Sequence, residues 1–114
     1  MSNKKIVNKP NEAKLSSGRV VIIKEMSVDD MDFCNDITTI HQDGSGGTYF
    51  TGLAKARTAW LRRGIEGGDF KNFKLNAQGL TDDSVLKELL EEEKNELIQR
   101  IQGFQGMGEE KPSR

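Results

Sequence analysis

The stretch that decides the predicted fold is Leu80–Phe104, which has the sequence LTDDSVLKELLEEEKNELIQRIQGF. Its apolar residues are Val85, Leu86, Leu89, Leu90, Leu97, Ile98, Ile101 and Phe104. They recur at spacings of three and four, the period that places side chains on one face of an α-helix. Thr81 or Asp82 is a suitable N-cap and Gly103 a terminator. The stretch predicts one long amphipathic helix, with the run Glu91–Glu93 on its solvated face.

Two shorter elements are predicted in the first half of the chain. Arg19–Glu25 is a β-branched run flanked by charges, which predicts a strand that pairs within this chain, with a second copy or with a partner. Ser27, with Asp30 three residues later, predicts the start of a helix that ends near His41. The Gly/Ser-rich segment 42–47 then predicts a flexible connection.

A second helix is predicted around Trp60, the only tryptophan in the chain. It begins at Thr48 or Tyr49 and ends at Gly64 or at the pair Gly67-Gly68, because glycine commonly terminates helices. Residues 69–78 alternate aromatic and polar side chains, which is compatible with a short strand or with an extended loop over the core.

These elements together predict a mainly α fold, a small helical domain with one or two short β-strands and flexible termini. Residues 1–17 carry four lysines against one glutamate and predict a flexible basic arm. Residues 18–104 are predicted to form a single helical domain, and residues 105–114 a disordered tail.

The composition narrows the function classes. The chain is 34% hydrophobic and 31% charged, with a formal net charge of −1. Its single cysteine, Cys34, excludes an internal disulfide and a cysteine-based metal set. No apolar run approaches the roughly 18–20 residues that span a membrane. We therefore expect no membrane association, no metal and no cofactor, and a cytoplasmic location.

The chain has few groups suited to catalysis. Cys34 and His41 are the only thiol and the only imidazole. On one helix their side chains would lie about 10 Å apart, too far for a nucleophile–base hydrogen bond. The glycine-rich segments match neither a Walker A loop nor a dinucleotide fingerprint. The sequence therefore predicts that the protein is not an enzyme.

A basic segment raises the question of nucleic acid. Residues 55–74 carry six cations against two acids, close to aromatic residues that could stack on bases. The pI near 5.9 and the acidic segments on either side argue against this use. We interpret the cations as facing protein, either the chain's own helices or a neighbour's.

The same segment supplies the candidate partner-binding residues. They are Arg57, Trp60, Arg62, Arg63, Phe70 and Phe73. Arginine and large aromatic side chains dominate the energetics of many protein interfaces. The alternative is that the three aromatics are core residues, and for Trp60 the core is the favoured position.

The order of segments also resembles a known group. The strand-like run Val20-Val-Ile-Ile is followed by Lys-Glu-Met-Ser-Val-Asp-Asp, then a central helix and a closing Leu-Thr-Asp-Asp-Ser-Val-Leu-Lys-Glu-Leu-Leu helix with a charged tail. Over about two-thirds of the chain this layout resembles the small tail-assembly chaperones of tailed phages. The resemblance implies a non-enzymatic protein, often self-associating, that holds tail-tube or tape-measure subunits before assembly. A phage-encoded protein of this kind is expected in the host cytoplasm. It transfers no functional residue, and Gly44–Gly47 and the cationic Trp60 helix depart from it.

Two alternatives stay open. One is a structural adaptor in the virion of a tailed phage. The other, from a different class, is a small nucleic-acid-binding regulator that uses the cations of residues 55–74.

Overall fold

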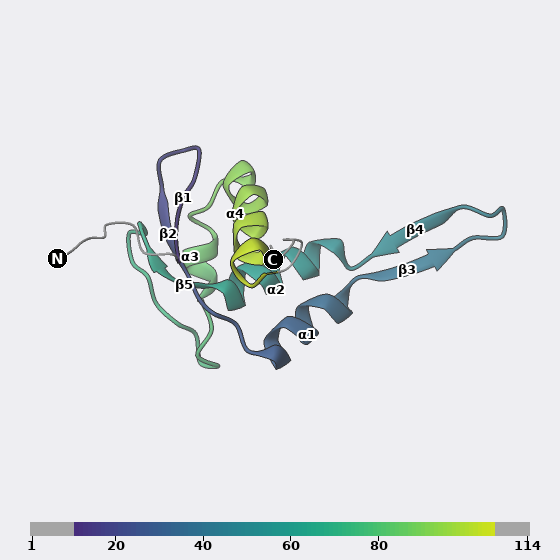
Figure 1. The fold of residues 1–114 in the computed structure, drawn as a ribbon, viewed down its shortest axis with the longest axis horizontal. Helices are drawn as coiled ribbons and strands as arrows, with labels where there is room; N and C mark the ends of the chain where they lie inside the picture. Colours follow the sequence, from purple (N-terminus) through teal and green to yellow (C-terminus); the bar gives the residue numbers. More distant parts are fainter. Residues whose placement is uncertain (1–10, 107–114) are drawn as a thin grey trace, which may run out of the picture.

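The computed structural model describes residues 11–106, which form a mixed α/β fold (Figure 1). In this part of the chain 42% of the residues are helical and 22% lie in strands of two small antiparallel sheets. The predicted mainly α fold is therefore wrong. The physical reason is that four of the five described strands occupy segments that the sequence pattern assigns to an arm, a helix or a turn.

A three-stranded antiparallel sheet forms one end of the fold. Its central strand is β2 (Val20–Ile23), which lies between β1 (Glu12–Lys14) and β5 (Ile65–Gly68). The strand predicted here is confirmed, and both of its pairing partners belong to this chain. Val21 and Ile23 are buried while the other two residues of β2 are half-buried, as expected for a strand with one face on the core.

The predicted ends of the domain need correction. Ala13 and Leu15 are buried in the core, so the flexible arm predicted over residues 1–17 is wrong for residues 11–17. Residues 1–10 lie outside the described residues, as do residues 107–114 of the predicted tail. Gln105, the first residue of that tail, donates from its side-chain amide to the Lys24 carbonyl.

Helix α1 (Val28–Ile37) begins as predicted and ends early. The Ser27 side chain accepts a hydrogen bond from the Asp30 N–H at 3.0 Å, so the predicted N-cap is confirmed. The helix ends at Ile37 rather than near His41. The next residues, Thr38 and Thr39, are β-branched and take the extended conformation that starts a strand.

Helix α2 (Leu53–Gly64) carries Trp60 into the core. Its predicted end at Gly64 is confirmed, but the start at Thr48 or Tyr49 is wrong because these residues form a strand. The chain passes from α2 directly into β5, so Gly67 and Gly68 lie in a strand instead of a terminating turn. Residues 69–78 contribute no strand to either sheet. Their end is ordered by a bridge from Leu75 to Thr81 and by hydrogen bonds between Asn76 and residues 78–80.

The C-terminal stretch forms two helices instead of one. Helix α3 (Asp83–Leu86) has Asp82 as its N-cap, and α4 (Glu91–Phe104) starts after Leu90. Glu93 explains the break. Its carboxylate accepts a hydrogen bond from the Leu90 N–H at 2.9 Å and is 5% exposed, whereas a solvated position was predicted for it. Glu91 and Glu92 are exposed, in agreement with the prediction.

A two-stranded hairpin projects from the other end of the fold. It consists of β3 (Thr39–Gln42) and β4 (Thr48–Thr51), which connect α1 to α2. Figure 1 shows it extending away from the three-stranded sheet, α3 and α4, at the right of the view. The core lies between the sheet and the helices, so the hairpin is outside it.

Candidate protein-docking surface

The hairpin turn is built by Asp43 and Gly46. The Asp43 N–H donates to the Gly47 carbonyl and the Gly46 N–H donates to the Asp43 carbonyl, with Gly46 at φ 93°. This is the three-residue loop in which a left-handed glycine follows a type I turn. The Asp43 carboxylate accepts hydrogen bonds from the Ser45 hydroxyl and from the Ser45 and Gly47 N–H groups, which lower its pKa. The predicted flexible connection over 42–47 is therefore an ordered turn.

The base of the hairpin is held by a close approach between two helix ends. Gly52 has φ 84° and is the N-cap of α2. A Cβ added to this residue would overlap the carbonyl oxygen of Ile37, the last residue of α1. Only glycine combines that left-handed conformation with so little space. The hairpin thus leaves the domain at a defined point.

The strands of the hairpin are exposed to an unusual degree. Seven of their eight residues are exposed, and the remaining one, His41, is only half-buried. Ile40 and Phe50 are directly opposite each other and therefore share one face, and they are 64% and 52% exposed. We call this pair, with Gln42 and Thr48, the Ile40 face of the hairpin.

The opposite face of the hairpin carries a stacked pair. The rings of His41 and Tyr49 lie parallel to within 14°, with centroids 4.9 Å apart. The His41 Nε2 atom is 2.9 Å from the Thr51 hydroxyl, which fixes the ring on this face. Neither face is covered by another element in the part of the chain that the structure describes, since these side chains stay largely open to solvent.

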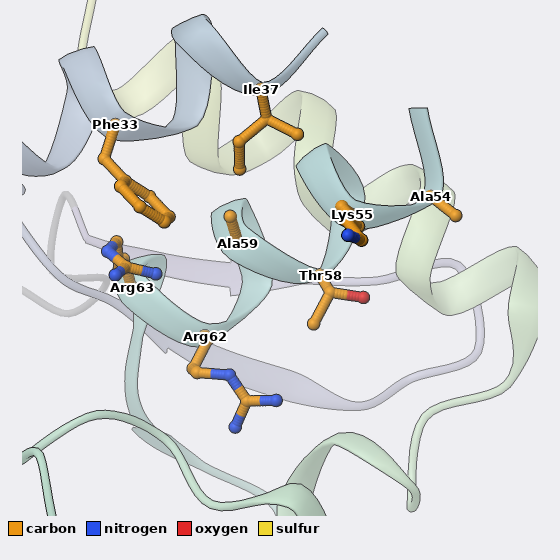
Figure 2. Close-up of a pocket in the computed structure, with 8 residues that line it drawn as sticks. All are labelled: Phe33, Ile37, Ala54, Lys55, Thr58, Ala59, Arg62 and Arg63. Atoms are coloured by element: carbon orange, nitrogen blue, oxygen red, sulfur yellow. The ribbon is translucent and has the colours of Figure 1, made fainter. Parts of the chain in front are cut away.

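A groove between α1 and α2 continues from the base of the hairpin. It has a volume of about 480 Å³ and is lined by Phe33, Ile37, Ala54, Lys55, Thr58, Ala59, Arg62 and Arg63. Figure 2 shows the Phe33 and Ile37 side chains reaching from α1 toward α2. Its lining combines apolar side chains from both helices with the cations Lys55, Arg62 and Arg63. The Ile40 face lies on the hairpin that connects α1 to α2, and the groove lies between these two helices.

The three candidate arginines do not lie free on the surface. Arg57 Nη1 is 2.7 Å from Glu91 Oε1, and Arg62 Nη2 is 2.7 Å from Asp83 Oδ1. Arg62 also donates to the Thr81 carbonyl at 2.7 Å. These arginines thus pair with carboxylates of the same chain. The sequence left two partners open for them, the chain's own helices and a neighbouring protein, and the structure shows the first.

Arg63 is held by two contacts with α1. Its Nε atom is 3.4 Å from Asp30 Oδ1, and its guanidinium lies 4.0 Å from the centroid of the Phe33 ring. A cation placed over an aromatic face is attracted by the ring quadrupole. Arg63 therefore closes one end of the groove and fastens α1 to α2.

We expect the double substitution Arg62→Glu with Arg63→Glu to destabilise the fold. It places new carboxylates beside Asp83 and Asp30 and removes the bond to the Thr81 carbonyl, for a loss of about 1–3 kcal/mol. Chemical denaturation followed by circular dichroism measures this loss. Lys55→Glu, an exposed reversal on the same helix, is the control and should change stability by less than about 0.5 kcal/mol. An unchanged denaturation midpoint in the double variant would indicate that neither arginine stabilises the fold and that both are available to bind a partner.

The three candidate aromatics belong wholly or partly to the core. Trp60 is 4% exposed, so it is a core residue, the position that the sequence favoured for it over a docking surface. Phe70 and Phe73 pack against the core as partly buried residues, with ring centroids 6.0 Å apart. The guanidinium of Arg19 lies 5.3 Å from the centroid of Phe70. The arginines among the six candidate residues thus form ion pairs within the chain, and the aromatics belong to the core or pack against it.

The groups suited to catalysis are kept apart. Cys34 is buried on α1, and burial raises the pKa of its thiol to about 11, so the thiol stays protonated at neutral pH. His41 lies on the hairpin. Within residues 11–106 no group of three or more His, Cys, Asp or Glu side chains is arranged to hold a metal ion. No helix in the same range is long and apolar enough to cross a membrane.

One sequence signal could have located the hairpin. Between residues 37 and 54 the chain carries a single charged side chain, Asp43, although 31% of all residues are charged. Such a neutral stretch, rich in Thr, Ile, Tyr and Phe and centred on Asp-Gly-Ser-Gly, is typical of a hairpin. The hairpin was missed because the Gly/Ser cluster was interpreted as a flexible linker.

No family model, no curated protein and no solved structure matches this chain. The resemblance to tail-assembly chaperones therefore stays a prediction, and the function is argued from the geometry of the described residues.

Proposed function

We propose that this protein is a non-enzymatic binding protein that holds another protein on its β3–β4 hairpin and on the groove between α1 and α2. The single observation that carries the proposal is a projecting hairpin whose strands carry no charged side chain and expose Ile40, Tyr49 and Phe50, on a domain that is otherwise highly charged. An isolated two-stranded hairpin is marginally stable in water and gains stability when a partner covers one face. A partner would also pair the unpaired strand edges.

The proposed client is a tail-tube or tape-measure subunit, as the resemblance to tail-assembly chaperones implies. A subunit that polymerises must be kept from its neighbours by covering an apolar or strand-edge surface. The hairpin offers both kinds of contact, with main-chain groups at its edges and the Ile40 face beside them. The neighbouring groove extends the apolar contact along α1 and α2.

The geometry gives less support to a nucleic-acid regulator. A β-ribbon that enters a DNA groove needs cations to neutralise phosphates, and residues 37–54 contain no lysine or arginine. The arginines of the basic segment are engaged with carboxylates of the same chain. Protein is thus the better partner class for this surface.

Co-expression with the tail-tube and tape-measure subunits of the same genome tests the proposal. The wild-type protein should keep one of these subunits soluble and co-purify with it as a complex of fixed composition. The substitutions Ile40→Thr and Phe50→Thr together remove both large side chains of the Ile40 face and retain β-propensity. We expect them to reduce the co-purified subunit at least about tenfold, because apolar anchors at an interface centre often contribute 2 kcal/mol or more.

The control for this experiment is Leu75→Thr, which removes an equally exposed apolar residue, 54% accessible, outside the hairpin. It should leave the co-purified amount unchanged, and all variants should keep the wild-type circular dichroism spectrum. Binding that survives in the Ile40→Thr/Phe50→Thr variant would contradict the proposed surface, and binding of neither subunit would contradict the proposed client. Retention of the protein in purified particles would favour the virion adaptor over a chaperone.

A further inference from the structure

The backbone of the hairpin presents hydrogen-bonding groups along both edges. Residue pairs in an antiparallel ladder alternate between hydrogen-bonded and non-hydrogen-bonded. The Asp43 N–H donates to the Gly47 carbonyl, so this pair is hydrogen-bonded. The alternation then makes Gln42–Thr48 and Ile40–Phe50 non-hydrogen-bonded pairs, whose N–H and C=O groups point outward. Each edge therefore offers two residues for pairing with a further strand.

Apart from their short length of four residues, these edges lack the usual protection against association. Natural edge strands are guarded by being very short, by lysine, by proline, by inward-pointing charges or by a covering segment. The strands of the hairpin contain no charged residue and no proline, and they are exposed. A second copy presents the same neutral surface, so two hairpins can approach without like-charge repulsion at the contact.

We propose that a second copy of this chain pairs with it along β4, so that two hairpins form one four-stranded antiparallel sheet in the order β3, β4, β4, β3. Thr48 of each copy then exchanges backbone hydrogen bonds with Phe50 of the other, and the two-fold axis passes beside Tyr49. The two copies use the same patch, as a closed dimer with two-fold symmetry requires. This inference concerns the protein alone and does not depend on the client proposed above.

The side chains favour β4 over β3 as the pairing edge. Pairing along β4 places Tyr49 opposite the Tyr49 of the second copy and Phe50 opposite Thr48. Aromatic–aromatic and aromatic–β-branched neighbours are favourable cross-strand pairs. Pairing along β3 would instead place His41 opposite His41 and Ile40 opposite Gln42. These pairs gain less.

The size of the contact sets its strength. A stable protein interface buries roughly 1,200–2,000 Å² in total, and an edge of four residues supplies only part of that area. We therefore expect a dissociable dimer whose population rises between roughly 10 and 500 μM, in the range of weak complexes.

Sedimentation velocity of the purified full-length protein over this concentration range tests the pairing. The wild-type protein should shift from monomer to dimer as concentration rises. Tyr49→Lys places two cations opposite each other across the axis and should remain monomeric, while Leu75→Lys should behave as wild type. A wild-type protein that is monomeric at about 500 μM, or a Tyr49→Lys variant that dimerises as wild type does, would overturn the inference.

Disulfide cross-linking tests the register independently of folding defects in Tyr49→Lys. In a Cys34→Ala background, Tyr49→Cys brings two thiols together at the axis, where opposed Cα atoms of a non-hydrogen-bonded pair are about 4.5 Å apart. Copper phenanthroline with dissolved oxygen should then give a covalent dimer on non-reducing gels. His41→Cys is the matched control, since three strand spacings separate its two copies by about 14 Å, and it should stay monomeric. Cross-linking of His41→Cys instead of Tyr49→Cys would overturn the pairing along β4.

Discussion

Trp60→Ala is expected to lower the free energy of unfolding by about 3–5 kcal/mol, the range measured for truncation of buried large aromatics. Trp60 is 4% exposed and packs in the core cluster with residues from the sheet and from α4. Truncation removes the transfer free energy of the indole and leaves a cavity that the neighbours fill only in part. For a domain of this size the thermal midpoint should fall by at least about 12 °C.

Circular dichroism during urea denaturation measures this loss, because the substitution removes the tryptophan fluorescence. Phe50→Ala is the control, an aromatic on the exposed hairpin that is expected to change stability by less than about 1 kcal/mol. Trp60 would be an interface residue instead of a core residue if Trp60→Ala kept the wild-type midpoint while losing its partner.

Glu93→Gln is expected to destabilise the fold by up to about 3 kcal/mol at pH 7. The buried Glu93 carboxylate accepts hydrogen bonds from Ser17 Oγ at 2.6 Å, Arg19 Nε at 3.0 Å and the Leu90 N–H at 2.9 Å. It thus joins the β1–β2 turn to the start of α4. A glutamine has no charge to pair with Arg19, whose guanidinium would stay half-buried beside Phe70.

The same carboxylate gives the fold a dependence on pH. Burial raises the pKa of Glu93, but the hydrogen bonds from Arg19, Leu90 and Ser17 outweigh burial and lower that pKa to about 2, from the usual 4.5. Because the folded-state pKa is depressed, the stabilisation is fully present above pH 4.5 and is lost as the pH falls from there toward 2.

Denaturation midpoints measured from pH 7 to pH 2 test this dependence. The wild-type protein should lose stability steeply below about pH 4.5, and Glu93→Gln should show a flatter profile. Glu92→Gln, the exposed neighbour, is the matched control and should follow the wild-type curve. Equal slopes for wild type and Glu93→Gln would show that other groups cause the acid sensitivity.

Elements with local signals were predictable from the sequence. Ser27 and Asp82 cap their helices as expected because N-capping depends only on a side chain and an N–H two or three residues away. The β2 strand followed from a run of four β-branched residues. The division of the C-terminal stretch was missed because Glu93 was expected on the solvated face. Its carboxylate instead accepts from the Leu90 N–H at the start of α4 and is held in a buried position by Arg19, which lies 74 residues earlier in the chain.

The candidate site was predicted only in part. The arginines at positions 57, 62 and 63 are typical of interfaces in composition, but their carboxylate partners on α1, α3 and α4 became visible only in the fold. The hairpin lacked the periodic apolar signal of a strand with a buried face, because neither of its faces meets the core. Its absence of charge was the usable signal.

Amide hydrogen exchange on the purified complex with a tail subunit is the most direct test of the central claim, that the hairpin is the surface that binds protein. In the isolated protein at low concentration the amides of residues 39–51 should exchange fast, since the hairpin is exposed. In the complex they should slow at least about tenfold, together with those of Ala54–Thr58 beside the groove. Unchanged exchange in the hairpin, with new protection elsewhere in the chain, would contradict the claim.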